Sequence, residues 1–589
     1  MKKKPFFLMA IAVVIVAAVV IYALNSSSPQ EPIARKEHDI ISNLNAKDIV
    51  AKMNDKEKIG QLVMYTPLRN QESFSKEMIQ EYYIGSVLLN DQKVSAKEAA
   101  TFNNQLQQWA SESRLGIPMF ITGDLEYGAA QRVPGEATVL PRQMAIGATQ
   151  NVEYAYQAAK ITAAEAKAMG FHWSYSPVAD VYSNPLNSVI GVRSFGEDTK
   201  LVNEMVAAEV KGYKSEGMIS SAKHFPGHGD TSFDSHTTLA TVTYSEDVLR
   251  KVHLPPFKTA IDQGIESIMT SHIIIQAIDP ELPATLSKKV LTGLLRDELG
   301  FQGIIVTDAM VMEAISNNWG AGEAAVMAIN AGADIIMANG SASDQLDTVD
   351  SLYQALQDGK ITRSRIDESV ERIITYKLEN KMFDHRFVDI DHATMVVGSK
   401  DHWEISEQIA QDSITLLKNV NVLPFDPQTN ESTLIVSVAY AEQIAETVRK
   451  VSKGEVISYQ AARATGEKLD VSQESIDAAL EQAQSADRII VFTYSDSQIA
   501  QGQIDLVNQL QGTGKPVVAV SLGNPNDILG YPGVSAYLAT YALDTWYWMT
   551  PIPVSWDAAV RVIFGANPKG KLPVTISSAY PLGFGLSYP

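Results

Sequence analysis

Short apolar segments alternate with longer segments of helical spacing from about residue 41 to residue 382. The apolar segments have the length and residue types of buried strands, and eight can be recognised: 60–65, 84–89, 118–123, 171–176, 219–224, 267–272, 303–308 and 333–338. The intervening segments repeat apolar residues at helical intervals, as in 95–112, 151–169, 201–216, 248–263 and 321–331. Eight strand–helix repeats without adjacent hairpins predict a (β/α)8 TIM-type barrel over residues 41–382.

A second module of alternating strands and helices begins near residue 400. Its predicted strands are 433–439, 455–459, 488–494, 516–522 and 536–542, and its predicted helices are 441–451, 475–486 and 497–511. We expect residues 401–589 to form an α/β open-sheet (sandwich) domain, joined to the barrel by a linker over residues 383–400.

The N-terminus carries a targeting pattern. Lysines at positions 2–4 precede an apolar run over residues 6–24 that contains no charge. Such a run can cross a bilayer as a helix, with the lysines inside and the rest of the chain outside; a cleaved signal peptide is the alternative. We expect residues 1–24 to be a transmembrane anchor or signal segment and residues 25–40 a tether. The protein is then extracytoplasmic, either membrane-anchored or secreted.

Composition narrows the possible partners. The net charge of −20 disfavours nucleic acid as a partner, and we expect contact with a membrane only through the N-terminal segment. The chain contains no cysteine, which excludes disulfides and thiolate metal sites. The oligomeric state stays open.

Charged and polar residues stand at the ends of five predicted barrel strands. Asp124 and Asp180 follow the third and fourth strands, and the fifth, sixth and seventh end in Lys223 and His224, in His272 and in Asp308. The carboxyl ends of the strands form the active face of such barrels. We therefore expect these side chains to meet at one rim.

The segment 223–236 holds three histidines, His224, His228 and His236. Its Gly, Pro and Ser content predicts a loop, and a loop crowded with titratable groups is typical of catalytic sites. Asp234 stands two residues before His236, so its carboxylate could orient the imidazole. The alternatives are a solvated polar loop and a zinc site of His224, His228 and Asp230, although their spacing is not a recognised zinc pattern. We expect neither a metal nor a cofactor.

Several motifs carry a resemblance to a known family. The sequence KHFPGHGDT at 223–231, followed by Asp234-Ser235-His236, resembles the signature of glycoside hydrolase family 3, specifically of its β-N-acetylglucosaminidase branch. The resemblance continues in SPVAD at 176–180, VIGVRSFGED at 189–198, VTDAM at 306–310 and, in the second module, at 514–517, 567–573 and 583–588. It covers the chain from about residue 45 to the C-terminus.

The resemblance implies a retaining mechanism with a covalent glycosyl-enzyme intermediate. Asp308 matches the nucleophile of the family, and His236, assisted by Asp234, matches the general acid/base of this branch. An imidazole can donate and accept a proton near neutral pH. It also places no second anion beside Asp308, so phosphate is an acceptor to consider beside water.

The resemblance also assigns the sugar-binding positions. Four residues match positions that bind hydroxyls of the non-reducing sugar: Asp124, Arg193, Lys223 and His224. Charged groups with several donors or acceptors suit vicinal hydroxyls. For Arg193, the alternative is a structural ion pair with Glu197 or Asp198.

Two features depart from the family pattern. Tyr127 stands where a small residue is usual, and Met310-Val311-Met312 follows the predicted nucleophile in place of Leu-Glu-Met. We expect both changes to affect the shape of the sugar pocket rather than the chemistry. The aromatic cluster 546–548 is expected to be buried packing, with a carbohydrate platform as the alternative.

The sequence therefore predicts an exo-acting β-N-acetylglucosaminidase whose carbohydrate substrates are N-acetylglucosamine-terminated peptidoglycan fragments or chitooligosaccharides. The alternatives are a β-glucosidase or β-xylosidase of the same family, an N-acetylglucosaminide phosphorylase, and a catalytically silent, membrane-tethered carbohydrate-binding protein. Glucosidases of the family usually take their acid/base from elsewhere in the chain, so the histidine loop argues against them. The joint presence of Asp308, Asp234 and His236 argues against the silent binder.

Overall fold

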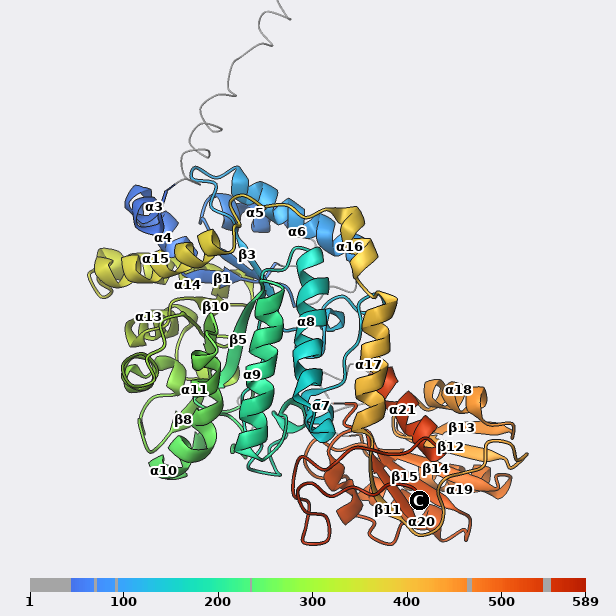
Figure 1. Ribbon diagram of the computed structural model, residues 1–589. Coiled ribbons are helices and arrows are strands. Elements are labelled where there is room, and N and C mark those ends of the chain that lie inside the picture. The colour runs from blue at the N-terminus through green and yellow to red at the C-terminus, as the bar shows by residue number, and fades with distance from the viewer. Residues whose placement is uncertain (1–43, 68–70, 91–93, 233–235, 463–468, 544–551) are drawn as a thin grey trace, which may run out of the picture.

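The computed structural model describes residues 44–67, 71–90, 94–232, 236–462, 469–543 and 552–589, which form two α/β modules (Figure 1). The predicted N-terminal segment and tether, Asp234 and the aromatic cluster 546–548 lie outside these ranges. Within them, no helix is both long enough and apolar enough to span a bilayer.

Eight parallel strands form a barrel in the described part of the chain, which confirms the predicted fold class. They are β1 (Val63–Tyr65), β2 (Ser86–Leu88), β3 (Phe120–Gly123), β4 (Trp173–Ser174), β5 (Ile219–Phe225), β7 (Ser267–Thr270), β9 (Ile304–Val306) and β10 (Ile336–Ala338). Their order follows the chain, β10 pairs with β1, and a bridge between Val306 and Ile335 joins the last two strands. Each lies within its predicted segment or extends one residue beyond it.

Helices surround the barrel (Figure 1). The longer ones are α6 (Ala96–Ser111), α8 (Val152–Ala168), α9 (Thr199–Ser215), α13 (Ala321–Ala331), α14 (Ala342–Gln357) and α15 (Arg363–Glu379). The shorter ones are α3 (Ala46–Lys52), α4 (Asp55–Gln61), α5 (Glu72–Gln80), α7 (Gln143–Thr149), α12 (Glu313–Ser316), η1 (Ala129–Gln131), η2 (Gly191–Arg193), η4 (Ala284–Leu286) and η5 (Lys289–Glu298). Polar caps fix where helices begin: Ser95 caps α6, and Asp198 caps α9.

Two details around β5 and β7 differ from the prediction. The expected helix 248–263 is divided into α10 (Glu246–Val248), a π-helical turn η3 (Leu249–His253) and α11 (Leu254–Asp262). The short strands β6 (Ala240–Val242) and β8 (Ile273–Ile275) pair in parallel outside the barrel sheet. Both strands lie outside the strand–helix alternation that identifies the barrel strands.

Large apolar side chains fill the inside of the barrel. Phe120 and Trp173 lie edge to face with ring centroids 5.5 Å apart, in a buried cluster that includes Met269 and Ile304. The indole Nε1 of Trp173 donates to Ser221 Oγ at 2.9 Å. The interior is a packed core, so polar chemistry is confined to the end of the barrel.

The C-terminal module is an open sheet with helices on its faces. Its strands are β11 (Thr415–Asn419), β12 (Thr433–Ser437), β13 (Val456–Gln460), β14 (Arg488–Thr493), β15 (Val517–Ser521) and β16 (Ala536–Ala539), in the order β11-β16-β15-β14-β12-β13. The helices are α18 (Ala441–Val451), α19 (Gln473–Gln484), α20 (Gln501–Gln511), η6 (Pro525–Leu529) and α21 (Pro553–Ile563). Strand β11, which pairs antiparallel to β16, was not predicted.

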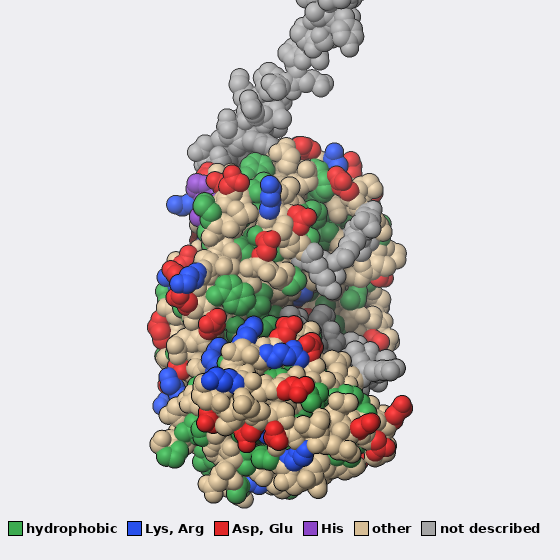
Figure 2. All heavy atoms as spheres, turned by 90° about the vertical axis from the view of Figure 1, so that its right-hand side faces the viewer, with side chains coloured by type: hydrophobic (Ala, Val, Ile, Leu, Met, Phe, Trp, Pro, Cys, Tyr) green, Lys and Arg blue, Asp and Glu red, His purple; other side chains and the backbone are tan. Residues whose placement is uncertain are grey.

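Two helices lead from the barrel to the second module. Helix α16 (Ile390–Val396) falls inside the predicted linker and packs against α6 and α8, and α17 (Lys400–Ser413) continues to β11. Figure 2 shows the side of the molecule on which α16, α17 and the C-terminal module lie. Lys and Arg side chains gather near the middle of this face with acidic side chains beside them, so neither sign of charge dominates it.

The two modules share a buried contact next to the barrel's active face. Tyr182 and Ile190, from the connection between β4 and α9, pack with Ala539 and Tyr541 at the end of β16. Asn524, from the loop after β15, donates through Nδ2 to Tyr182 Oη at 2.9 Å. The β4–α9 connection is therefore held against the second module by apolar packing and by a hydrogen bond.

Candidate active site

A pocket of about 350 Å³ opens at the carboxyl ends of the barrel strands. All the predicted site residues that the structure describes line it: Asp124, Arg193, Lys223, His224, His236 and Asp308. Residues from distant parts of the chain thus converge at the rim that the strand-end pattern predicted. The apolar part of the wall includes Met269, Val311, Met312 and Met337.

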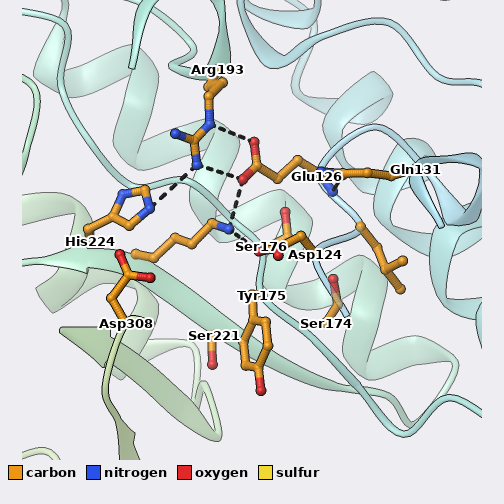
Figure 3. A network of polar contacts seen from close by, with 12 residues as sticks. Asp124, Glu126, Gln131, Ser174, Tyr175, Ser176, Arg193, Ser221, His224 and Asp308 are labelled. Carbon is orange, nitrogen blue, oxygen red and sulfur yellow. Dashed lines mark hydrogen bonds and ion pairs between the residues drawn. The ribbon is translucent and has the colours of Figure 1, made fainter. Parts of the chain in front are cut away.

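A network of buried ion pairs lies on one side of the pocket (Figure 3). Lys223 Nζ lies 2.7 Å from Asp124 Oδ1 and 2.7 Å from Glu126 Oε1. Arg193 donates to both oxygens of Glu126, at 2.9 and 2.7 Å. Arg132 Nη2 donates to Asp124 Oδ2 at 2.7 Å. Two carboxylates and three cations therefore form one connected cluster.

The network keeps its members charged. Burial alone would raise the pKa of Asp124, but Lys223 and Arg132 outweigh it and lower the pKa. The pKa of Glu126 falls well below its usual range because Arg193 and Lys223 together outweigh its burial. Both carboxylates raise the pKa of Lys223 against its own burial. At neutral pH both carboxylates are ionised, so neither has a proton to donate.

Asp180 orients the predicted sugar-binding histidine. Its Oδ2 lies 2.7 Å from His224 Nδ1, and its Oδ1 accepts from the backbone N–H of His228 at 2.6 Å. Asp180 is fully buried, and His224 more than offsets the burial and lowers the carboxyl pKa. With Nδ1 directed at Asp180, His224 Nε2 faces Arg193 Nη2 at 3.4 Å.

Asp308 lies across the pocket, two residues beyond the end of β9. Its Oδ1 accepts from the backbone N–H of Ala309 at 2.7 Å. Burial would raise its pKa, but the combined attraction of His224, His272 and His236 outweighs burial and lowers the pKa to about 2. The carboxylate is therefore ionised throughout the neutral range, which nucleophilic attack requires.

His236 lines the same pocket, and its backbone oxygen accepts from the N–H of Glu313 at the start of α12 at 3.1 Å. Because Asp234 lies outside the described residues, its pairing with His236 stays a prediction. In the described chain, no group of three or more His, Asp or Glu side chains has the arrangement of a metal site.

One alternative and one expectation from the sequence are wrong. Arg193 does not pair with Glu197 or Asp198: Glu197 accepts from the backbone N and the Oγ1 of Thr575 in the second module, and Asp198 caps α9. Tyr127 does not shape the pocket. It is 3% exposed, packs in the core of the second module, and stacks under the guanidinium of Arg142 at 3.5 Å. Val311 and Met312 do line the pocket.

Four residues line the pocket without having been predicted as site residues: Glu126, Arg132, Asn90 and Asn339. Asn90 and Asn339 directly follow the second and eighth predicted strands, so the strand-end rule that found Asp124 extends to them. Arg132 carries no such signal, because the turn η1 returns it to the pocket.

Both modules of the chain match domains of one known family. Residues 55–376 match the glycosyl hydrolase family 3 N-terminal domain, and residues 414–588 match the family 3 C-terminal domain. The chain belongs to glycosyl hydrolase family 3. The resemblance in its motifs is thereby confirmed, and so is its assignment as a glycosidase.

Relatives within family 3 carry more than one activity in their names. The chain is 31% identical to "Beta-hexosaminidase A" of Pseudoalteromonas piscicida over 85% of this chain and 90% of that protein. It is 26% identical to a "Periplasmic beta-glucosidase" of Salmonella typhimurium over 90% of this chain and 73% of that protein. A solved family 3 β-N-acetylglucosaminidase from Paenibacillus sp. superposes with a TM-score of 0.82 at 30% identity, covering 89% of this chain and 99% of that one.

The first prediction concerns the ion-pair network. Lys223→Met keeps the aliphatic stem but leaves Asp124 and Glu126 short of a cation, and removing one partner of a buried pair costs about 3–5 kcal/mol. We expect a loss of that order in the free energy of unfolding of the barrel, measured by urea denaturation. The control is Lys58→Met, whose pair with Asp367 at 2.6 Å is partly exposed and should contribute at most about 1 kcal/mol. Equal losses in the two variants would contradict the prediction.

Proposed function

We propose that this family 3 glycosidase is a retaining exo-β-N-acetylglucosaminidase. In this proposal Asp308 attacks the anomeric carbon while His236, assisted by Asp234, donates a proton to the departing oxygen. His236 then takes a proton from water, which attacks the glycosyl-enzyme and restores the Asp308 carboxylate. The substrates are N-acetylglucosamine-terminated peptidoglycan fragments or chitooligosaccharides.

One observation carries the proposal for the acid/base. Among the described residues that line the pocket, the carboxylates other than Asp308 are Asp124 and Glu126, and both are held ionised by cations at 2.7 Å. A group that must first donate a proton cannot be either of them. The imidazole of His236 lines the same pocket and can serve both steps.

The pocket and the relatives support N-acetylglucosamine as the sugar. Met269, Met312 and Met337 provide an apolar wall that suits the methyl of an acetamido group, and methionine side chains adapt to such contacts. The relatives named as a hexosaminidase and a β-N-acetylglucosaminidase match nearly their full length. For location, we infer export through the N-terminal segment; one relative is named as periplasmic and another as secreted.

Phosphorolysis is the second candidate because of a specific feature of the charge balance. Three cationic side chains against two carboxylates leave one excess positive charge in the network beside the pocket, and Asp308 carries no charge while it is esterified in the glycosyl-enzyme. An acid/base that is an imidazole adds no anion. Both features lower the electrostatic cost of admitting phosphate as the acceptor.

The second prediction tests the sugar and the acceptor. We expect the protein to release a chromophore from an aryl β-N-acetylglucosaminide with a higher kcat/KM than from the matching aryl β-glucoside. The same assay with added phosphate separates the two acceptors, since phosphorolysis yields the sugar 1-phosphate instead of the free sugar. Preference for the glucoside would overturn the proposed specificity.

The third prediction tests the acid/base. Because poor leaving groups need protonation, His236→Ala should slow their release by about 10²–10⁴-fold, and release of activated phenols far less. Asp234→Ala should show the same pattern more mildly, and the two losses should not multiply in the double variant because the residues act as a unit.

The matched control for this experiment is His385→Ala, at an exposed histidine in the segment that follows α15. It should leave the rates for both classes of substrate unchanged. If His236→Ala instead reduces the rates equally for all leaving groups, His236 is not the general acid.

A further inference from the structure

Asn187, in the connection between β4 and α9, is 1% exposed and uses both ends of its side chain. Its Oδ1 accepts from the backbone N–H groups of Val189 and Ile190, at 3.1 and 2.8 Å. Its Nδ2 donates to the backbone oxygen of His228 at 2.8 Å and to Thr231 Oγ1 at 3.1 Å. One buried carboxamide therefore joins two loops that are about 40 residues apart, and a carboxamide offers no more than two donors and two acceptor sites.

The acceptor end fixes the turn that carries Arg193. The backbone N–H of Arg193 donates to Ile190 O at 2.8 Å, and its Nη1 donates to Val189 O at 3.0 Å. Val189 and Ile190 thus hold Arg193 through their backbone oxygens, and their N–H groups donate to Asn187 Oδ1. The guanidinium is directed from this turn onto Glu126 (Figure 3).

The donor end fixes the start of the histidine loop. His228 is held through its oxygen by Asn187 and through its N–H by Asp180, and Asp180 also holds His224 Nδ1. Since His224 Nε2 faces Arg193, the contacts form a closed ring. It runs from Arg193 through Ile190 to Asn187, and then through His228, Asp180 and His224 back to Arg193. Asn187 is the member that closes this ring.

We propose that Asn187 is a positioning residue that sets the Arg193 turn through Oδ1 and the first part of the histidine loop, His228 to Thr231, through Nδ2, and so couples sugar binding to proton transfer. The inference rests on the proposed roles of Arg193 and His236. Two substitutions distinguish the roles of Oδ1 and Nδ2, because one alters Nδ2 alone and the other removes both atoms.

Asn187→Asp keeps the acceptor end and replaces the donor end with a carboxylate oxygen that repels His228 O. Asp180 still holds the N–H and Nδ1 of His224 in this variant, so sugar binding should survive and the dissociation constant for N-acetylglucosamine should stay within about threefold of the original. The value of kcat/KM for poor leaving groups should fall about 10–100-fold more than for activated phenols. Asn187→Ala removes both ends, so it should also weaken N-acetylglucosamine binding by about tenfold or more.

Two further variants protect the test against a simple loss of folding. Asn103→Asp makes the same change at an asparagine that is also 1% exposed and also donates to a backbone oxygen at 2.8 Å, that of Met169, on the opposite end of the barrel from the site. It should alter neither readout. Thr231→Val deletes one acceptor of Nδ2, and with it the contact of Thr231 Oγ1 with His228 Nδ1, without touching the Arg193 turn. It should reproduce the pattern of Asn187→Asp in weaker form.

The outcomes separate this inference from the proposed function. If His236→Ala shows the leaving-group effect and Asn187→Asp does not, the inference is wrong and the function stands. If neither shows it, the proposed acid/base is wrong, and the N-acetylglucosamine affinity of Asn187→Ala decides whether Asn187 positions Arg193. Equal losses of binding and of all rates in Asn187→Asp and Asn187→Ala would mean a merely structural role.

Discussion

The contact of Lys223 with the carboxylates of Asp124 and Glu126 is the constraint on which the active site depends. It joins β5 to the connection after β3, and through Glu126 it reaches Arg193 in the β4–α9 connection. Removing such charges from water costs several kcal/mol per ion, so the cluster persists only because its oxygens and N–H groups are paired with one another. A small displacement of any strand end would leave a buried charge without its partner.

The same contact assigns the chemical roles around the pocket. Two of the three described carboxylates that line it are committed to cations, which leaves Asp308 as the carboxylate available for covalent chemistry. Its pKa of about 2 keeps it ionised, and the imidazoles that lower this pKa come from three different elements. In the proposed mechanism proton transfer falls to His236, and the β4–α9 connection becomes important because it positions Arg193 beside His224. The second module contributes by holding that connection through Tyr182 and Asn524.

The sequence predicted the parts of this arrangement that periodic patterns and strand ends determine. The eight barrel strands were found because buried parallel strands are continuous apolar runs, and Asp124, Lys223 and Asp308 were found because they end such runs. Strand β11 was missed because only Leu416 and Leu417 of its five residues are apolar. Strands β6 and β8 were missed because they lie outside the strand–helix alternation that identified the barrel strands. Tyr127 was misjudged because a family position does not reveal which way a side chain turns. The position of Arg132 depends on the turn η1, which no local pattern encodes.

The most direct test of the covalent mechanism is to trap the intermediate. With His236→Ala and an activated aryl β-N-acetylglucosaminide, attack by Asp308 proceeds while water is poorly activated, so the glycosyl-enzyme should accumulate. Mass spectrometry of the digested protein should then find one N-acetylhexosamine on the peptide that contains Asp308. An adduct on another residue, or release of sugar with inverted anomeric configuration and no adduct, would contradict the mechanism.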